Sequence, residues 1–165
     1  MEKEVLTREI LDILEFDSRR TPADIAVMLD QPEDLIKSMI EEMEKDGTIL
    51  TYKAVVNRQR VESKKTQCII EVQCSPQRGV GFDSIAQRIY KFPEVKSLSL
   101  MSGGFDLLLL VEGDSMKEIA FFVAEKLATL DHVKSTSTHF LLKRYKEGGY
   151  ILESEEKPPR LAVTP

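Results

Sequence analysis

The fold of the N-terminal part of this chain is decided by residues 21–56, TPADIAVMLDQPEDLIKSMIEEMEKDGTILTYKAVV. Thr21 can cap a helix, because its hydroxyl and the carboxylate three residues later form a capping-box pattern. A second helix begins after Pro32 and ends at Gly47, and residues 49–56 then form an extended segment. This order predicts a helix-turn-helix followed by a small wing, an arrangement that usually binds DNA.

The charge of this stretch conflicts with its shape. A helix that enters the major groove usually carries Arg and Lys, whereas the helix after Pro32 carries six acidic residues and two lysines. Residues 1–60 hold 9 Lys or Arg and 14 Asp or Glu, and the remainder holds 14 of each, so the net charge of −5 lies entirely in the first part. The helix residues concerned are Glu33, Asp34, Glu41, Glu42, Glu44 and Asp46, with Lys37 and Lys45.

Another helical pattern precedes the quoted stretch. Leu6, Ile10, Ile13 and Leu14 recur at the spacing i, i+4, i+7, i+8 and give this segment one apolar stripe. Together with the two later helices and the extended segment, it predicts a winged helix-turn-helix DNA-binding domain over residues 1–56.

The composition is that of an ordinary globular protein, with 165 residues, 42% hydrophobic and 31% charged. This length allows one medium domain or two small ones. The N-terminus lacks the apolar segment of a signal peptide, and the longest purely aliphatic run is far too short to cross a membrane. We therefore expect a cytoplasmic protein with no membrane partner.

The sequence predicts no catalytic residues, no metal site and no cofactor. Cys68 and Cys74 would lie about 20 Å apart along one strand, too far for an easy disulfide. Both would point to the same face of that strand, so we expect two buried, reduced thiols. His132 and His139 have no Cys, Asp or Glu at the spacing of metal ligands.

The hydrophobic pattern changes after residues 57–66, a polar stretch that we interpret as a linker. Between residues 67 and 150, strand and helix patterns alternate in the order β-α-β-β-α-β, which predicts a ferredoxin-like domain. The chain as a whole is then of the α+β class. Residues 151–165 are charged and rich in proline, and we expect them to form a flexible tail.

One strand of this predicted domain bears on assembly. Residues 107–111 are all aliphatic, whereas a sheet with helices on one face and water on the other should alternate apolar and polar residues. Both faces of this strand are therefore apolar, and the uncovered face would be an exposed patch in a monomer. We expect a homodimer in which the two sheets pack together.

Three motifs carry a resemblance to a known family. They are residues 47–52 (GTILTY) with Asn57 after them, residues 81–83 (GFD) leading to residues 92–95 (FPEV), and residues 102–106 (SGGFD) before the aliphatic strand. In this order, and with the two predicted domains, the chain resembles the Lrp/AsnC family, the feast/famine transcriptional regulators. The resemblance covers residues 3–150.

The resemblance implies a sequence-specific regulator that binds double-stranded DNA as a homodimer, often assembled into an octamer. It also implies that residues 67–150 form the effector-sensing and oligomerisation domain, and that a small-molecule effector, typically an amino acid, is bound between dimers. In such proteins the glycine-rich turn between the second and third strands helps form the effector pocket with the start of the last strand. Carried over to this sequence, the effector-binding residues are Ser102, Gly103, Gly104, Phe105, Asp106, Ser135, Thr136 and Thr138.

This chain departs from the family at the turn before the recognition helix, which is usually Gly–hydrophobic–Ser and here is residues 30–32 (DQP). Pro32 cannot offer a hydroxyl to a helix end or to a phosphate. Because DNA affinity rests on neutralising phosphates, we expect contacts at the helix start, the wing and the linker, aided by avidity in the oligomer. The predicted DNA-binding residues are Arg19, Arg20, Thr21, Gln31, Lys37, Ser38, Lys53 and Arg58.

Two other functions stay open. Winged helices also serve as protein-interaction modules, so the chain could be a metabolite-sensing oligomer that acts through protein partners without DNA. The same two-domain fold also serves as a sirohaem decarboxylase, but those enzymes carry a basic, His-rich segment where this chain has residues 100–104. A hairpin turn and a polar sheet surface would equally explain Gly103, Gly104 and residues 135–138.

Overall fold

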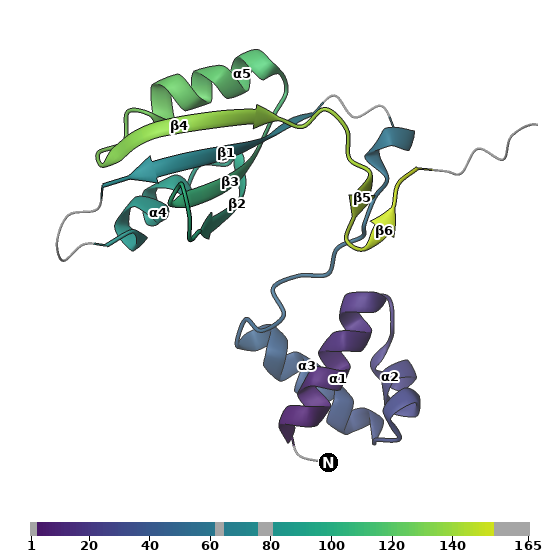
Figure 1. The fold of residues 1–165 in the computed structure, drawn as a ribbon. Helices are drawn as coiled ribbons and strands as arrows, with labels where there is room; N and C mark the ends of the chain where they lie inside the picture. The colour runs from purple at the N-terminus through teal and green to yellow at the C-terminus, as the bar shows by residue number, and fades with distance from the viewer. Residues whose placement is uncertain (1–2, 62–64, 76–80, 154–165) are drawn as a thin grey trace, which may run out of the picture. The chain divides into compact units, whose positions relative to one another are not determined.

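The computed structural model describes residues 3–61, 65–75 and 81–153. The chain divides into two compact units, residues 1–56 and residues 57–165. Helices build the first unit, and the β-sheets belong to the second (Figure 1). Within the described ranges, no helix has the length and apolar character needed to span a membrane.

Three helices form the first unit: α1 (Lys3–Phe16), α2 (Pro22–Leu29) and α3 (Glu33–Lys45). Each helix buries one apolar face, and the three faces meet in a single core, while the acidic residues of α3 point outward. The core residues are Leu6, Ile10, Leu14, Ile25, Ala26, Ile36, Met39, Ile40 and Met43.

The turn between α2 and α3 depends on the backbone of Asp30. Its backbone adopts the left-handed helical conformation, with φ 50° and ψ 50°, and its N–H donates to the carbonyl of Ala26. Glycine usually takes this position, but Asp is among the residues that tolerate it. Pro32 then precedes α3 in an extended conformation and, as expected, gives no side-chain cap. Asp30 thus makes the turn without the family's glycine.

The predicted wing does not form a strand pair. Gly47, with φ 80°, lets the N–H of Ile49 reach the carbonyl of Met43 at 2.9 Å and so closes α3. Residues 50–56 then run to the second unit without any β-strand. They are too few for two strands and a hairpin turn of ordinary length, which explains why the extended pattern did not become a wing.

The second unit contains a four-stranded sheet, whose strands are β1 (Thr66–Cys74), β2 (Val95–Leu100), β3 (Leu107–Gly113) and β4 (Val133–Phe140). The spatial order is β2-β3-β1-β4, and all neighbours are antiparallel. Helix α4 (Asp83–Ile89) follows β1. Helix α5 (Met116–Phe121) follows β3 and continues as a π-helix over Phe122–Leu127. The β-α-β-β-α-β order predicted from the sequence is confirmed.

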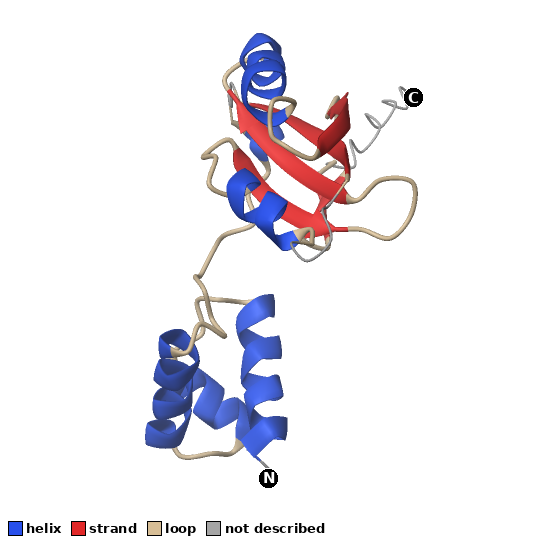
Figure 2. Cartoon of the chain, turned by 90° about the vertical axis from the view of Figure 1, so that its left-hand side faces the viewer, coloured by secondary structure: helices blue, strands red, loops and turns tan. Residues whose placement is uncertain are grey.

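Both helices cover the same face of this sheet (Figure 2). Alternate residues of β1 and β3 are buried there against α4, α5 and the π-helix, where Phe92 also meets Phe122 edge to face at 5.5 Å. Cys68 and Cys74 lie on this buried face as free thiols, as expected, and burial raises the pKa of Cys68 to about 11. The sheet residues of the core are Cys68, Ile70, Val72, Cys74, Leu107, Leu109 and Val111.

Among the described residues, the opposite face of the sheet has no helix over it. Leu108 and Leu110 lie on this open face and are half-buried, and Ile69 beside them is exposed. Ser97 and Ser99 pair with the two leucines from β2. The aliphatic run therefore does place apolar side chains on both faces, but hydroxyl groups border the patch on the open face.

Residues expected to be linker and tail instead contact each other. Asn57 caps a 3-10 helix, Arg58–Arg60, and its amide donates to the carbonyl of Leu152 at 2.8 Å. A hairpin of β5 (Lys146–Glu147) and β6 (Tyr150–Ile151) precedes Leu152 (Figure 1). Leu152 itself is buried, so the first residues of the expected tail pack against the second unit. Such short strands leave no period in the sequence. The remaining tail, residues 154–165, lies outside the described residues.

Candidate functional site

Few of the predicted DNA contacts on α3 and in the turn before it keep a free hydrogen-bond donor among the described residues. The hydroxyl of Ser38 donates to the carbonyl of Leu35 at 2.8 Å, and the amide of Gln31 donates to the carbonyl of Asp30 at 2.9 Å. Lys37 is exposed and makes no ion pair with another described residue. Of the three predicted contacts here, Lys37 is thus the one whose polar group is not already bonded to the backbone.

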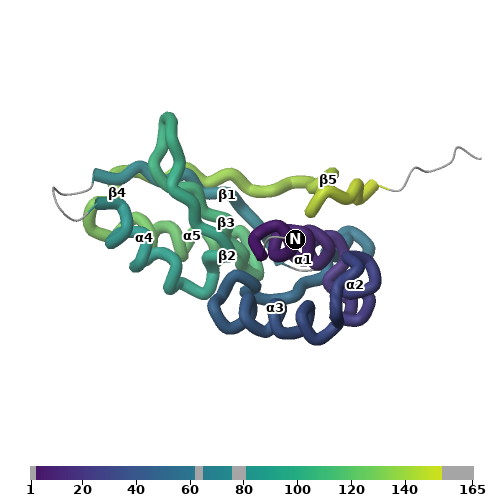
Figure 3. Tube along the Cα trace, turned by 90° about the horizontal axis from the view of Figure 1, so that it is seen from below, coloured from purple at the N-terminus to yellow at the C-terminus, as the bar shows by residue number. Residues whose placement is uncertain are grey.

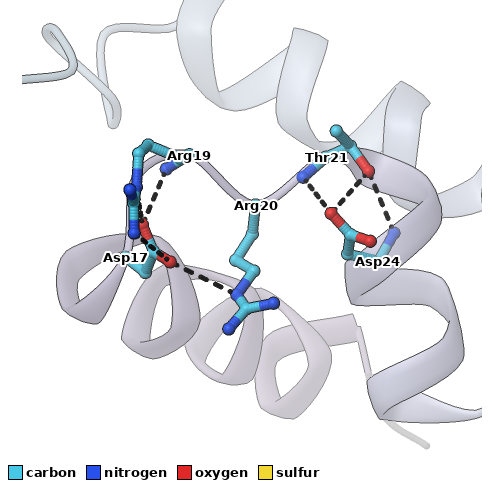
Figure 4. Close-up of polar contacts among 5 residues, drawn as sticks. All are labelled: Asp17, Arg19, Arg20, Thr21 and Asp24. Atoms are coloured by element: carbon cyan, nitrogen blue, oxygen red, sulfur yellow. Dashed lines mark hydrogen bonds and ion pairs between the residues drawn. The ribbon is translucent and has the colours of Figure 1, made fainter.

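The two arginines before α2 converge on one carboxylate (Figure 4). Arg19 places Nε 2.9 Å from Oδ1 of Asp17 and Nη2 3.3 Å from Oδ2. Arg20 places its Nε 3.5 Å from Oδ2 of the same residue. The hydrogen bonds from Arg19 lower the pKa of Asp17, which keeps the carboxylate charged. Asp17 was not among the predicted site residues, because a lone Asp in a loop carries no motif.

Thr21 caps the N-terminus of α2 with its side chain. Its hydroxyl accepts the N–H of Asp24 at 3.1 Å and donates to Oδ2 of Asp24 at 2.8 Å, while its own N–H donates to the same oxygen at 2.9 Å (Figure 4). The backbone hydrogen bond from Thr21 lowers the pKa of Asp24. The predicted capping box is confirmed, and a phosphate would have to compete with Asp24 for this hydroxyl.

The remaining predicted DNA contacts lie on either side of the boundary between the units. Lys53 is exposed in the extended segment after α3, and Arg58 is exposed in the 3-10 helix of the second unit. Seven of the eight predicted residues therefore belong to the first unit. Tyr52 holds the segment around Lys53, because its hydroxyl donates to the carboxylate of Glu44 on α3 at 2.8 Å.

The glycine loop, residues 101–106, connects β2 to β3 and is longer than a two-residue hairpin turn. The N–H of Met101 donates to the carbonyl of Asp106 at 2.8 Å and closes the loop. Gly103 has φ 140°, a conformation that favours glycine. The carboxylate of Asp106 accepts the N–H of Cys74 at 2.7 Å, so one of its oxygens already stabilises the end of β1.

Gln73 of β1 connects the two predicted halves of the effector site. Its amide nitrogen donates to the carbonyl of Gly104 at 2.9 Å, and its carbonyl oxygen accepts the hydroxyl of Ser135 at 2.9 Å. Strands β1 and β4 run side by side (Figure 3). Gln73 pairs with Ser135 in their register. Sequence reasoning missed Gln73, because a single polar residue at the end of a strand does not stand out.

The predicted residues of β4 divide between the two faces of the sheet. Ser135 pairs with Gln73, whereas Thr136 and Thr138 pair with Val72 and Ile70, which belong to the helix-covered face. Directly paired residues of an antiparallel sheet share a face. The structure therefore brings Ser135 together with the glycine loop through Gln73 and turns the two threonines to the other face.

A cavity of about 460 Å³ lies between α4 and the edge strand β2. It includes Leu100 and Leu107, which flank the glycine loop, but none of the eight predicted effector residues. The lining residues are Phe82, Asp83, Ala86, Tyr90, Val95, Lys96, Ser97, Leu98, Leu100 and Leu107.

The described part of the chain contains no group of three His, Cys, Asp or Glu side chains placed to hold a metal ion. His139 lies on the open face of the sheet, 3.2 Å from the hydroxyl of Ser137 and 3.5 Å from the carboxylate of Glu71. Both contacts involve the same ring nitrogen, Nε2, so these three residues do not form a relay through the imidazole.

Residues 67–151 match the family described as the Lrp/AsnC ligand binding domain. The chain is 43% identical over 158 residues to the HTH-type transcriptional regulator YugG of Bacillus subtilis (strain 168), with 95% of each protein covered. It is also 25% identical over 141 residues to the proline dehydrogenase transcriptional activator of Rhizobium radiobacter, covering 86% of this chain and 90% of that protein.

Solved structures share the fold. An AsnC family transcriptional regulator from Agrobacterium tumefaciens superposes with a TM-score of 0.66 and 25% identity, covering 93% of this chain and 96% of the other. The transcriptional regulator NMB0573 of Neisseria meningitidis, in complex with L-Met, gives a TM-score of 0.67 at 22% identity, covering 89% and 93%. At 22% identity, the second likeness shows the fold alone.

The contact between Tyr52 and Glu44 predicts an unusual tyrosine titration. Burial, followed by the hydrogen bond and the negative charge of Glu44, raises the pKa of Tyr52 to about 12. Because the folded pKa exceeds the unfolded value, this contribution to stability is complete below about pH 10 and is lost as the pH rises towards 12. The absorbance of tyrosinate should show Tyr52 titrating near pH 12 in the wild type and at a lower pH in Glu44→Gln. Tyr52→Phe identifies the signal, and an unchanged titration in Glu44→Gln would contradict the assignment.

Proposed function

This chain belongs to the Lrp/AsnC family, and on that premise we propose that it is a DNA-binding transcriptional regulator controlled by an amino acid or a related small metabolite. The single observation that carries the DNA-binding half is the α2–turn–α3 arrangement, with Thr21 capping α2 and left-handed Asp30 setting the turn. We assign these elements as a helix-turn-helix in which α3 is the recognition helix. The relative at 43% identity is itself named an HTH-type transcriptional regulator.

The electrostatics of the first unit favour contacts at its edges rather than along α3. Acidic side chains cover the outer surface of α3, and Glu42 is already paired with Lys3 at 2.9 Å. Lys37 near the start of α3 and Lys53 in the following segment are exposed. Because each phosphate contact releases counterions, a few such cations on every protomer support binding when several protomers engage one DNA segment.

Binding to a fragment of the protein's own promoter should fall with salt and depend on these cations. The charge reversals Lys37→Glu and Lys53→Glu together should abolish binding of the fragment or, where residual binding is measurable, reduce the salt slope by about two for each protomer bound. The matched control reverses Lys91 and Lys117, exposed lysines of the second unit, and should bind like the wild type. Fluorescence anisotropy over a salt series measures both quantities.

Two results would count against this interpretation. Survival of binding in the Lys37→Glu, Lys53→Glu variant would show that the contacts lie elsewhere. The absence of any binding by the wild type at low salt would favour the other candidate function, a metabolite-sensing oligomer that acts through protein partners. The acidic surface of α3 is the observation that supports this second function.

For the effector, we propose a site at the glycine loop that includes Gln73. The loop presents backbone N–H groups around Gly103 and Gly104, which suit a carboxylate. The second carboxylate oxygen of Asp106 has no partner among the described residues and suits an α-ammonium, while the first holds the end of β1. Gln73 and Ser135 add an amide and a hydroxyl. Together these groups match the two charged ends of an amino acid.

Calorimetric titration with the twenty amino acids, L-methionine included, tests this site. Gln73→Ala removes the bridge between Gly104 and Ser135 and should weaken binding of the recognised amino acid about tenfold. The control is Gln87→Ala, which removes the same group from the exposed surface of α4. Equal affinity in both variants would place the effector away from Gln73, and the absence of heat with all twenty would reject an amino-acid effector.

We further propose that two protomers pair through the open faces of their sheets. Leu108, Leu110 and Ile69 form a small apolar patch that a second copy would cover. Sedimentation velocity at micromolar concentration should show a dimer for the wild type and a monomer for Leu110→Glu. Leu50→Glu changes a leucine of the first unit that is 88% exposed and should remain dimeric. A monomeric wild type would contradict the pairing.

A further inference from the structure

We propose that Asp17 is a positioning residue that holds Arg19 and Arg20 ready for DNA phosphates. This inference rests on the proposed DNA-binding function. It names the side chain that orients two of the predicted DNA contacts, Arg19 and Arg20. Its basis is the three-residue cluster in the loop between α1 and α2 (Figure 4).

The position of Asp17 is set by the backbone, independently of the arginine side chains. Its N–H donates to the carbonyl of Ile13 at 2.9 Å, which ties it to the last turn of α1. Its Oδ1 accepts the backbone N–H of Arg19 at 3.2 Å, which shapes the loop. The carboxylate is only 20% exposed, so it offers the arginines a fixed anchor rather than a mobile partner.

Arg19 is held along one side of its guanidinium. Nε and Nη2 donate to the two oxygens of Asp17, and these bonds use two of the five N–H groups of an arginine. The edge formed by Nη1 and the second hydrogen of Nη2 remains available. That edge has the fork geometry that matches phosphate, and the side chain is 89% exposed. Asp17 therefore orders the arginine without occupying its phosphate-binding edge.

Two opposing effects follow from this arrangement. A free arginine loses much rotamer freedom when it binds a phosphate, and the anchor at Asp17 has already removed part of that freedom. The carboxylate also repels phosphate, but salt screens charges at an exposed surface. The three-residue cluster itself holds two guanidinium groups and one carboxylate and has a net positive charge, and the nearby carboxylate of Asp24 also interacts with Arg20. We infer that positioning outweighs repulsion.

The substitution Asp17→Asn separates these effects, because they predict opposite signs. Asparagine keeps an oxygen for the N–H of Arg19, so the loop is retained while the ion pairs are lost. Affinity for the promoter fragment should fall on the order of threefold to tenfold, although a negative charge has been removed. Glu15→Gln, an equal charge change at an exposed residue of α1, should leave affinity unchanged or raise it.

A double-mutant cycle shows whether Asp17 acts through the arginines. In a background that carries Arg19→Ala and Arg20→Ala, Asp17→Asn should no longer weaken binding, and affinity should stay unchanged or rise as in Glu15→Gln, whereas a distorted loop would still lower it. In the otherwise native protein, Asp17→Asn should also lower the salt slope by about one for each protomer bound to DNA, the change expected when one arginine–phosphate contact is lost. Arg19→Lys keeps the positive charge but loses the forked guanidinium, so it should weaken binding even with Asp17 intact. This variant tests the proposal if Asp17→Asn does not fold.

The possible outcomes distinguish this inference from the function on which it rests. Wild-type binding with an Asp17→Asn affinity equal to or above that of Glu15→Gln overturns the positioning role and leaves the regulator intact. The same holds if Arg19→Lys binds like the wild type. Failure of the wild type to bind DNA at low salt overturns both. Weaker binding with a lower slope in Asp17→Asn supports the proposal.

Discussion

Strand β1 is hydrogen-bonded along both edges, to β3 and to β4, and the second unit depends on this double pairing. The pairing fixes which residues of β1 face the helices, because a slip of one residue would move every side chain to the other face. Cys68, Ile70 and Val72 are completely buried in the observed register. The same register places Gln73 between Gly104 on one side and Ser135 on the other.

Polar contacts also mark the other end of this strand. Gln67 accepts a hydrogen bond from the guanidinium of Arg144 at 3.0 Å, and Gln59 donates to the carbonyl of Arg144 at 2.6 Å. The segment after β4 thus returns to the residues that follow the first unit and packs against them through Leu152 and Asn57. One central strand joins the glycine loop to the place where the chain enters the second unit.

The first unit is governed by charge as much as by packing. Its apolar core accounts for the three helices, but the surface of α3 is acidic, and several predicted DNA contacts are bonded within the protein. Arg19 and Arg20 pair with Asp17, and Thr21 is engaged by Asp24. The number of Lys and Arg residues therefore does not show which cations contact DNA. Their availability depends on the hydrogen bonds and ion pairs that they already make within the protein.

Most of the fold was predictable, because its signals are local. The helical spacing of apolar residues located the helices, and the capping box located the start of α2. The β-α-β-β-α-β order followed from the alternation between helical and strand spacing of apolar residues. The predicted wing was wrong, because an extended pattern needs a partner strand and residues 50–56 are too short to supply one. The ordered contacts of Asn57 and Leu152 were missed, because they join residues 95 positions apart.

The candidate sites divide in the same way. The residue pattern alone determined the family resemblance, the glycine loop and the acidic character of α3, since each is a property of neighbouring residues. Only the tertiary structure decided that Gln73 links the loop to Ser135, that Thr136 and Thr138 face the helices, and that Asp17 holds two arginines. These relations depend on strand register and loop geometry, which bring side chains together by hydrogen bonding between backbones and leave no periodic trace in the chain.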